Sequence, residues 1–117
     1  MSQGFQDATP EPPSSRTRRE LARVRADLRV VLSYRDGEKL PARVVDVSVG
    51  GMNLRADRVP EYGEAITVIV RLRETEDWHL IPAAVRWFSQ GGFGVAFENL
   101  SAGQQRALRI FVEQSAA

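Results

Sequence analysis

The sequence predicts an all-β fold, a six-stranded antiparallel barrel followed by a C-terminal helix. Short apolar–polar alternations recur over about 27–99, and turns rich in glycine, proline and acidic residues separate them. No helical segment alternates with the strands, which favours antiparallel pairing. The last segment, about 101–114, changes to a helical pattern.

The first two strands are predicted to form a hairpin. Apolar residues occupy every second position of 28–34, as expected for a half-buried strand. The pair Asp36-Gly37 follows and favours a two-residue turn, in which both central positions need positive φ. The return strand is expected over about 40–47.

The next two strands flank a short glycine break and a loop. The sequence SVGG at 48–51 interrupts the return strand, and alternation resumes at Met52, Leu54 and Ala56. After the loop VPEYGE, the β-branched run at 65–72 predicts a fourth strand.

The last two strands are expected on either side of Gly91-Gly92. The fifth covers 79–89, where Pro82 indicates an edge or a bulge. Trp87 and Phe88 face opposite ways on that strand, and Trp87 is favoured as the core residue while the other side chain can contact a ligand or partner. In the sixth strand three apolar residues share one face: Phe93, Val95 and Phe97.

The ends of the chain differ in character. Residues 1–15 form a predicted disordered tail, and 16–117 form one domain that opens with a basic segment at 16–26. In the helix, Ser101 is a suitable N-cap, and Gln104 completes a capping box.

Composition restricts the class of protein. The 117 residues include no cysteine, which excludes disulfides, thiol nucleophiles and thiolate metal sites. No apolar run reaches the roughly 18 residues of a membrane span, and the N-terminus lacks the pattern of a signal peptide. A cytoplasmic protein is therefore expected.

The positive charge is concentrated before the first strand. Residues 16–29 contain six arginines, Glu20 and Asp27, a local charge of +4 in a chain of net charge +1. Such a local cluster indicates one anion-binding place and argues against a broad nucleic-acid surface.

Catalytic chemistry has no support in the sequence. His79 is the one histidine, no cluster has metal-ligand spacing, and no nucleophile elbow or phosphate-binding glycine motif is present. The glycines at 91–94 lie between strands, where no helix N-terminus receives a phosphate. We therefore expect neither an enzyme nor a metal site.

Two groups of residues suggest ligand binding instead. Arg19-x-x-x-Arg23 can grip a phosphate or a guanine edge through paired N–H donors. Asp46 and Ser48 are expected on one outer face, opposite Val45 and Val47, and can accept hydrogen bonds from a base. Alone, either group is also explained as a solvated linker or a capped turn.

Together, these residues resemble the two-part motif of the PilZ domain family. Arg18 extends the first half, and Asp46-x-Ser48-x-x-Gly51 follows Arg23 after twenty-two residues. The stretch GFGVAFENLS at 92–101 resembles the last strand of that family and the turn into its helix. The resemblance covers about 17–113 and implies a PilZ-like barrel.

The resemblance also implies a ligand, the bacterial second messenger cyclic di-GMP. The implied ligand-binding residues are Arg18, Arg19, Arg23, Asp46, Ser48, Gly50 and Gly51. Arg18 implies binding of a stacked pair of ligand molecules. The implied function is that of a receptor and adaptor that relays the signal to an unidentified effector protein.

The alternative is a PilZ-like interaction module that binds no nucleotide. Nucleic acid is disfavoured as a partner because the basic charge is local and no row of exposed aromatic residues is evident. The sequence leaves the oligomeric state open.

Overall fold

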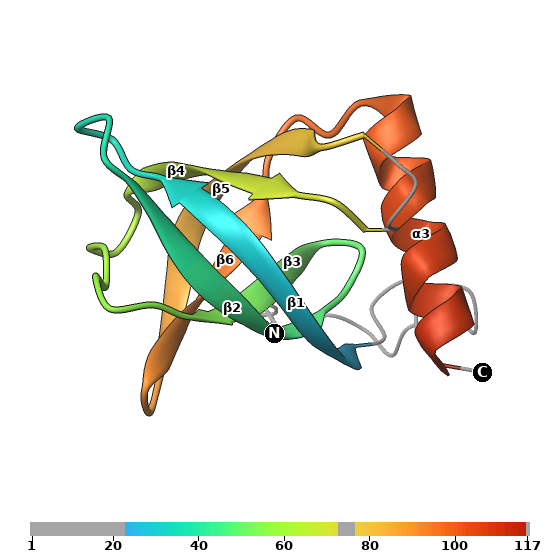
Figure 1. Cartoon of the computed structure of the whole chain (residues 1–117), viewed down its shortest axis with the longest axis horizontal. Coiled ribbons are helices and arrows are strands. Elements are labelled where there is room, and N and C mark those ends of the chain that lie inside the picture. The colour runs from blue at the N-terminus through green and yellow to red at the C-terminus, as the bar shows by residue number, and fades with distance from the viewer. Residues whose placement is uncertain (1–22, 73–76, 117) are drawn as a thin grey trace, which may run out of the picture.

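The computed structural model describes residues 23–72 and 77–116, which form a closed barrel of six antiparallel strands followed by a helix (Figure 1). The order around the barrel is β1-β2-β3-β6-β5-β4, and β4 pairs with β1. The predicted fold class is confirmed. The elements are β1 Val24–Ser33, β2 Lys39–Val47, β3 Gly51–Arg55, β4 Ala65–Val70, β5 His79–Ser89, β6 Gly92–Phe97 and α3 Ala102–Ala116.

The first strand begins earlier than the sequence predicts. β1 includes residues 24–26, which the sequence analysis assigns to the basic segment. Val24 is buried, and Ala26 is partly buried against the core, so the alternation that marks 28–34 extends back to Val24. Ala26 presents too little apolar surface to make this part of the pattern evident.

The β1–β2 hairpin has a three-residue loop, so the predicted two-residue turn is wrong. The Tyr34 N–H donates to the Glu38 carbonyl at 2.7 Å, which closes the loop around residues 35–37. The Gly37 N–H donates to the Tyr34 carbonyl at 2.9 Å, and Gly37 has φ of 93°. This is the arrangement of a turn followed by a glycine bulge, in which only the glycine needs positive φ.

The core lies inside the barrel and continues under the helix. Its largest fully buried side chains alternate along the strands, as period-two patterning requires. α3 lies across one end of the barrel (Figure 1), where Leu108 and Val112 are buried and Phe111 packs partly against the core. The helix thus packs one apolar face, formed by these three residues, on the barrel. The largest buried strand side chains are Phe93, Leu32, Met52, Leu54 and Ile81.

The start of the helix is fixed as predicted. The Gln104 N–H donates to Ser101 Oγ at 3.0 Å, and the Ser101 N–H donates to Gln104 Oε1 at 3.1 Å. These reciprocal bonds form a capping box. Gln104 Nε2 also donates to the Leu80 carbonyl at 3.0 Å, which ties the helix to β5.

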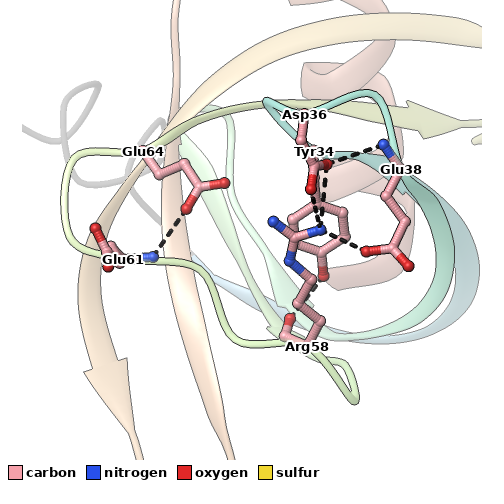
Figure 2. Close-up of polar contacts among 6 residues, drawn as sticks. All are labelled: Tyr34, Asp36, Glu38, Arg58, Glu61 and Glu64. Atoms are coloured by element: carbon pink, nitrogen blue, oxygen red, sulfur yellow. Dashed lines mark hydrogen bonds and ion pairs between the residues drawn. The ribbon is translucent and has the colours of Figure 1, made fainter.

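A polar cluster closes the end of the barrel at the β1–β2 hairpin. Figure 2 shows the Arg58 guanidinium between Asp36 and Glu38 and above the Tyr34 ring. The Tyr34 hydroxyl donates to the Arg58 carbonyl at 2.6 Å, so the hairpin is joined to the loop before β4. Burial raises the pKa of Tyr34, and the hydrogen bond from the Glu38 N–H together with Arg58 lowers the pKa of Asp36.

Candidate ligand-binding site

A transverse row of residues crosses the outer face of the barrel over five neighbouring strands. Arg25 of β1 pairs with Asp46 of β2, Asp46 with Asn53 of β3, Asn53 with Gly94 of β6, and Gly94 with Trp87 of β5. The chain neighbours of Asn53 and Gly94 are buried, so both positions face outward. The strand order thus brings distant parts of the chain to one surface.

A bulge in β2 sets the orientation of Asp46. Val44 pairs with Leu54 and Asp46 pairs with Asn53, which leaves Val45 as the extra residue. Val44 and Val47 are buried, whereas Val45 is half-buried. The expectation that Val45 faces the core is therefore wrong, because the bulge changes the alternation before Asp46.

The Asp46 carboxylate is held by two neighbouring side chains. Arg23 Nη1 donates to Oδ1 at 3.0 Å, and Asn53 Nδ2 lies 2.9 Å from Oδ1 and 3.1 Å from Oδ2. The Asp46 side chain keeps 23% of its surface exposed, and that of Arg23 keeps 40%. The ion pair is accessible, and a ligand can reach the carboxylate.

Trp87 forms an aromatic platform on the same surface. A bulge at Arg86 separates the pairs Val85–Val95 and Trp87–Gly94, which places Trp87 on the outside. The preference for Trp87 as a core residue is wrong, because the side chain is only half-buried. Phe88 is also exposed, at 51%.

Close packing and a hydrogen bond fix the Trp87 indole. A Cβ added to Gly94 would lie 1.8 Å from the ring, so only glycine admits the indole there. The indole Nε1–H donates to Asn53 Oδ1. The Arg23 guanidinium lies 5.1 Å from the ring centroid, within the range of a cation–π contact.

Ser48 does not stand beside Asp46 on the outer face. It is 4% exposed, and its Oγ donates to the Gly51 carbonyl at 3.3 Å and accepts from the Gly50 N–H at 3.3 Å. The expectation of an exposed hydroxyl is therefore wrong. The chain turns after Val47, and Ser48 caps that turn.

The two glycines of the turn have different surroundings. A Cβ at Gly51 would lie 2.2 Å from the Val95 carbonyl oxygen, whereas a Cβ at Gly50 meets nothing within 4 Å. The Gly50 carbonyl accepts from the Phe97 N–H at 2.8 Å. Gly51 thus permits the close approach of β3 and β6, and a contact of either glycine with a ligand stays a prediction.

Arg23 joins the predicted site, and the other two arginines of the motif lie outside the described residues. Of the predicted ligand-binding set, Arg23 and Asp46 are in direct contact. Arg18 and Arg19 precede residue 23, as does the predicted tail at 1–15. The site also contains residues that the sequence interpretation missed, Asn53 and Gly94, although both stand at outward positions between apolar neighbours.

This arrangement suits a planar, nitrogen-rich ligand. The carboxylate accepts hydrogen bonds, the guanidinium donates them, and the indole offers a face for stacking. Guanine presents N1–H and N2–H donors on one edge and O6 and N7 acceptors on another. One patch of the barrel therefore holds complementary groups for both edges.

A family model described as the PilZ domain matches residues 17–114. The chain belongs to the PilZ domain family. The resemblance carried by the arginine motif and by Asp46-x-Ser48-x-x-Gly51 is confirmed at the level of the family. The closed six-stranded barrel with its C-terminal helix is the PilZ fold.

Solved structures share this fold. The PilZ domain of YcgR from Escherichia coli, solved with cyclic di-GMP, has a TM-score of 0.67 and 20% identity over 85% of this chain and 94% of its own. The PilZ domain of CeSA from a cellulose-synthesizing bacterium has a TM-score of 0.65 and 16% identity over 82% and 99%. At these identities the likeness establishes the fold.

The Bacillus subtilis inhibitor of motility, MotI, has a TM-score of 0.65 and 24% identity. The match covers 88% of this chain and 55% of MotI, so the chain spans about half the length of that protein. No curated protein sequence matches the chain.

Residues 23–72 and 77–116 contain neither a membrane-crossing helix nor a cluster of metal-binding side chains. No helix in these ranges has the length and apolar character needed to cross a membrane. Nor do these ranges contain a group of three or more histidine, cysteine or acidic side chains placed to hold a metal ion.

Proposed function

We propose that the chain is a cyclic di-GMP receptor that relays the signal to a partner protein. The observation that carries the proposal is the 3.0 Å contact between Arg23 and Asp46, because it joins the two halves of the motif in one exposed site. Family membership supports it. The PilZ domain of YcgR and the PlzA protein of Borreliella burgdorferi were both solved with cyclic di-GMP.

In this proposal each group of the site contacts a different part of the ligand. Asp46 accepts the N1–H and N2–H bonds of a guanine, and Trp87 stacks on the base or on the guanidinium that contacts it. Arg23 and Arg19 donate to the guanine O6/N7 edge and to phosphate oxygens. Ser48, Gly50 and Gly51 shape the turn that holds Asp46 in place.

Arg18 supports binding of two stacked ligand molecules. An additional guanidinium directly before Arg19 increases the positive charge available to the phosphates, and its planar group can stack on a base. The resemblance to family members in which an arginine at this position accompanies a stacked pair of ligands implies two molecules of cyclic di-GMP for each chain.

Ligand binding competes with contacts that Arg23 makes in the free site. Arg23 is paired with Asp46 and lies over Trp87, so a guanine that takes these positions displaces its guanidinium. Arg23 belongs to the predicted basic segment and directly precedes β1, so its movement changes the surface at this end of the segment. A partner that contacts this segment then distinguishes the free from the bound state.

The proposal assigns binding and relay to the chain, and no reaction. The partner is an effector protein of unidentified type. The alternative is an interaction module that binds no nucleotide. The two functions differ in whether Arg23 and Asp46 bind a ligand, and this can be measured.

Isothermal titration with cyclic di-GMP tests the proposal. We expect a dissociation constant of roughly micromolar or below, about −8 kcal/mol, and a stoichiometry near two. Asp46→Asn removes the carboxylate that faces the guanine, and Arg19→Ala and Arg23→Ala remove donors. Each variant should weaken binding about tenfold or more.

Asp77→Asn is the matched control, because Asp77 is an exposed carboxylate far along the chain from Asp46. It should bind as the wild type does, and GTP should not bind to either protein. A folded wild-type protein that gives no heat and no ligand-induced rise in melting temperature would exclude the receptor function and favour the interaction module.

A further inference from the structure

Three arginines form a second transverse row on the outside of the barrel. Arg29 of β1 pairs with Arg43 of β2, and Arg43 pairs with Arg55 of β3. All three side chains are exposed. Directly opposite residues in an antiparallel sheet have Cβ atoms about 5 Å apart, so the three guanidinium groups share one face. We refer to Arg29, Arg43 and Arg55 as the arginine row.

The arginine row has little neutralising charge within the described residues 23–72 and 77–116. Arg43 lies 3.7 Å from Asp27, a pair in which both side chains are mostly exposed, at 57% and 85%. Neither Arg29 nor Arg55 has an ion-pair partner in these ranges. Like charges directly opposite each other destabilise a sheet, and within the described residues the exposed Arg43–Asp27 pair offsets this electrostatic cost only in part.

A shallow hollow lies beside the row. Its volume is about 470 Å³, and its charged lining consists of Arg25, Arg43, Arg55 and Asp27. The bulged Val45 contributes an apolar surface to it. A hollow with an apolar floor and several guanidinium groups at its border can receive side chains of another molecule.

We propose that the arginine row and this hollow form a docking surface for an acidic segment of a partner protein. Guanidinium groups bind carboxylates through two parallel hydrogen bonds. Carboxylates on a helix at i and i+4, or on a strand at i and i+2, are spaced about 5–7 Å apart, which matches neighbouring arginines of the row. The barrel is closed, so a partner cannot add a strand and must bind through outward side chains.

A protein segment fits this surface better than nucleic acid does. The arginine row spans three strands. Asp27 borders it on β1, and Asp46 borders it on β2, in the first transverse row that contains the candidate ligand site. A phosphate backbone needs a longer basic track than the one these carboxylates leave, whereas a short acidic segment needs only two or three neighbouring arginines.

The docking surface does not depend on the proposed ligand. None of the three arginines belongs to the predicted ligand-binding set, although Arg55 stands only two residues from Asn53 on β3. Binding of an acidic segment is therefore testable without cyclic di-GMP, and its failure is distinguishable from failure of the receptor proposal.

The test compares three proteins by fluorescence anisotropy with a labelled octaglutamate peptide at low ionic strength. The row variant carries Arg29→Ser, Arg43→Ser and Arg55→Ser. The control variant has the same change in charge but replaces three arginines elsewhere. These are Arg35→Ser on a turn, Arg71→Ser after β4 and Arg106→Ser on α3. We expect the row variant to bind about tenfold or more weakly than the wild type, and the control to stay within about twofold.

Two further ligands decide the chemical class of the partner. The same titrations are made with an oligo-dT that has the charge of the peptide, and with phosphatidylserine vesicles. Tighter row-dependent binding of either one would overturn the proposal in favour of nucleic acid or membrane. Absent peptide binding, or an equal loss in both variants, would overturn it as well.

Thermal unfolding shows whether the row serves the sheet itself. Because like charges oppose one another, the row variant should melt at or above the wild-type temperature at low salt, and added salt should stabilise the wild type more. A clear loss of stability in the row variant would contradict the proposal. The single variant Arg43→Gln gives the same binding comparison if the triple variant does not fold.

Discussion

Asn53 connects the two sides of the candidate site. Its amide nitrogen contacts both oxygens of Asp46, at 2.9 and 3.1 Å, and its amide oxygen accepts the bond from the Trp87 indole. One side chain thus orients the hydrogen-bonding carboxylate and the aromatic platform. A polar group left without its partner in a half-buried patch costs about 1–3 kcal/mol.

We expect Asn53→Leu to lower the free energy of unfolding by about 1–2 kcal/mol, since the Trp87 N–H and Asp46 each lose a partner. Cyclic di-GMP affinity should fall about tenfold, because Asp46 no longer has a fixed orientation. Urea denaturation and isothermal titration give the two values. Thr67→Val is the matched control, a half-buried polar residue on β4, and an Asn53→Leu protein with wild-type affinity would show that Asn53 only stabilises the sheet.

Part of this site is predictable from single residues. The pattern of the sequence places Arg23 and Asp46 in one motif, and Asn53 stands between Met52 and Leu54, at an outward position. The contact of Asn53 with Trp87 is not predictable in this way. It depends on the register of β3, β6 and β5, which no local pattern defines.

At the scale of elements, the packing of β3 against β6 determines one residue of the motif. Gly51 pairs with Ala96, and a Cβ on Gly51 would lie 2.2 Å from the backbone carbonyl oxygen of Val95. A backbone carbonyl cannot change its rotamer to avoid a clash, as a side chain can. Any larger residue at 51 must therefore separate the two strands.

We expect Gly51→Ala to lower the free energy of unfolding by about 1–3 kcal/mol, because β3 must move away from β6. Gly50→Ala should leave the free energy of unfolding nearly unchanged, since a Cβ there meets nothing within 4 Å and Gly50 does not have a positive φ. Chemical denaturation of the two variants measures the difference. A stable Gly51→Ala protein that has lost only ligand affinity would instead place the glycine at the ligand.

The strands themselves are largely predictable, and their irregularities are not. The fifth strand has the predicted bounds, 79–89, because its β-branched and aromatic residues lie between clear turn signals. The bulges at Val45 and Arg86 follow from the pairing of whole strands. Both bulges change which residues face outward, and for this reason the predicted orientations of Val45 and Trp87 are wrong.

At the scale of the whole molecule, β1 connects two regions of different chemistry. At its start, Arg25 pairs with Asp46 beside the candidate ligand site. At its end, Ser33 leads into the Tyr34–Arg58 cluster that joins the hairpin to the β3–β4 loop (Figure 2). Ten strand residues at about 3.3 Å each separate the two by roughly 30 Å, so we expect their energies to be independent.

The arginine row shows what only the complete fold reveals. The sequence places Arg29 in the predicted first strand, at the end of the charged stretch 16–29, and Arg43 and Arg55 stand apart on later strands. The shared register of β1, β2 and β3 assembles them on one face. The interpretation of one local cluster of positive charge is therefore incomplete, because strand pairing creates a second basic surface.

Asp36 tests the independence of the two ends. The hydrogen bond from the Glu38 N–H, at 3.0 Å, and the contacts with Arg58 hold the pKa of Asp36 below its ordinary value of 3.8. Since the folded-state pKa is the lower one, this stabilisation is fully present above pH 3.8 and is lost as the pH falls through the folded value. We therefore expect Asp36→Asn to lose less stability than the wild type between about pH 4 and pH 2 in thermal melts.

Asp77→Asn, which changes an exposed carboxylate outside this cluster, should retain the wild-type acid sensitivity. At neutral pH, Asp36→Asn should bind cyclic di-GMP with unchanged affinity, because the site residues that the structure describes, Arg23, Asp46, Asn53 and Trp87, form no hydrogen bond or ion pair with the hairpin cluster. An altered affinity would mean that β1 transmits strain from one end of the barrel to the other. In that case the hairpin end, and not only the basic segment, would belong to the surface through which a partner senses the ligand.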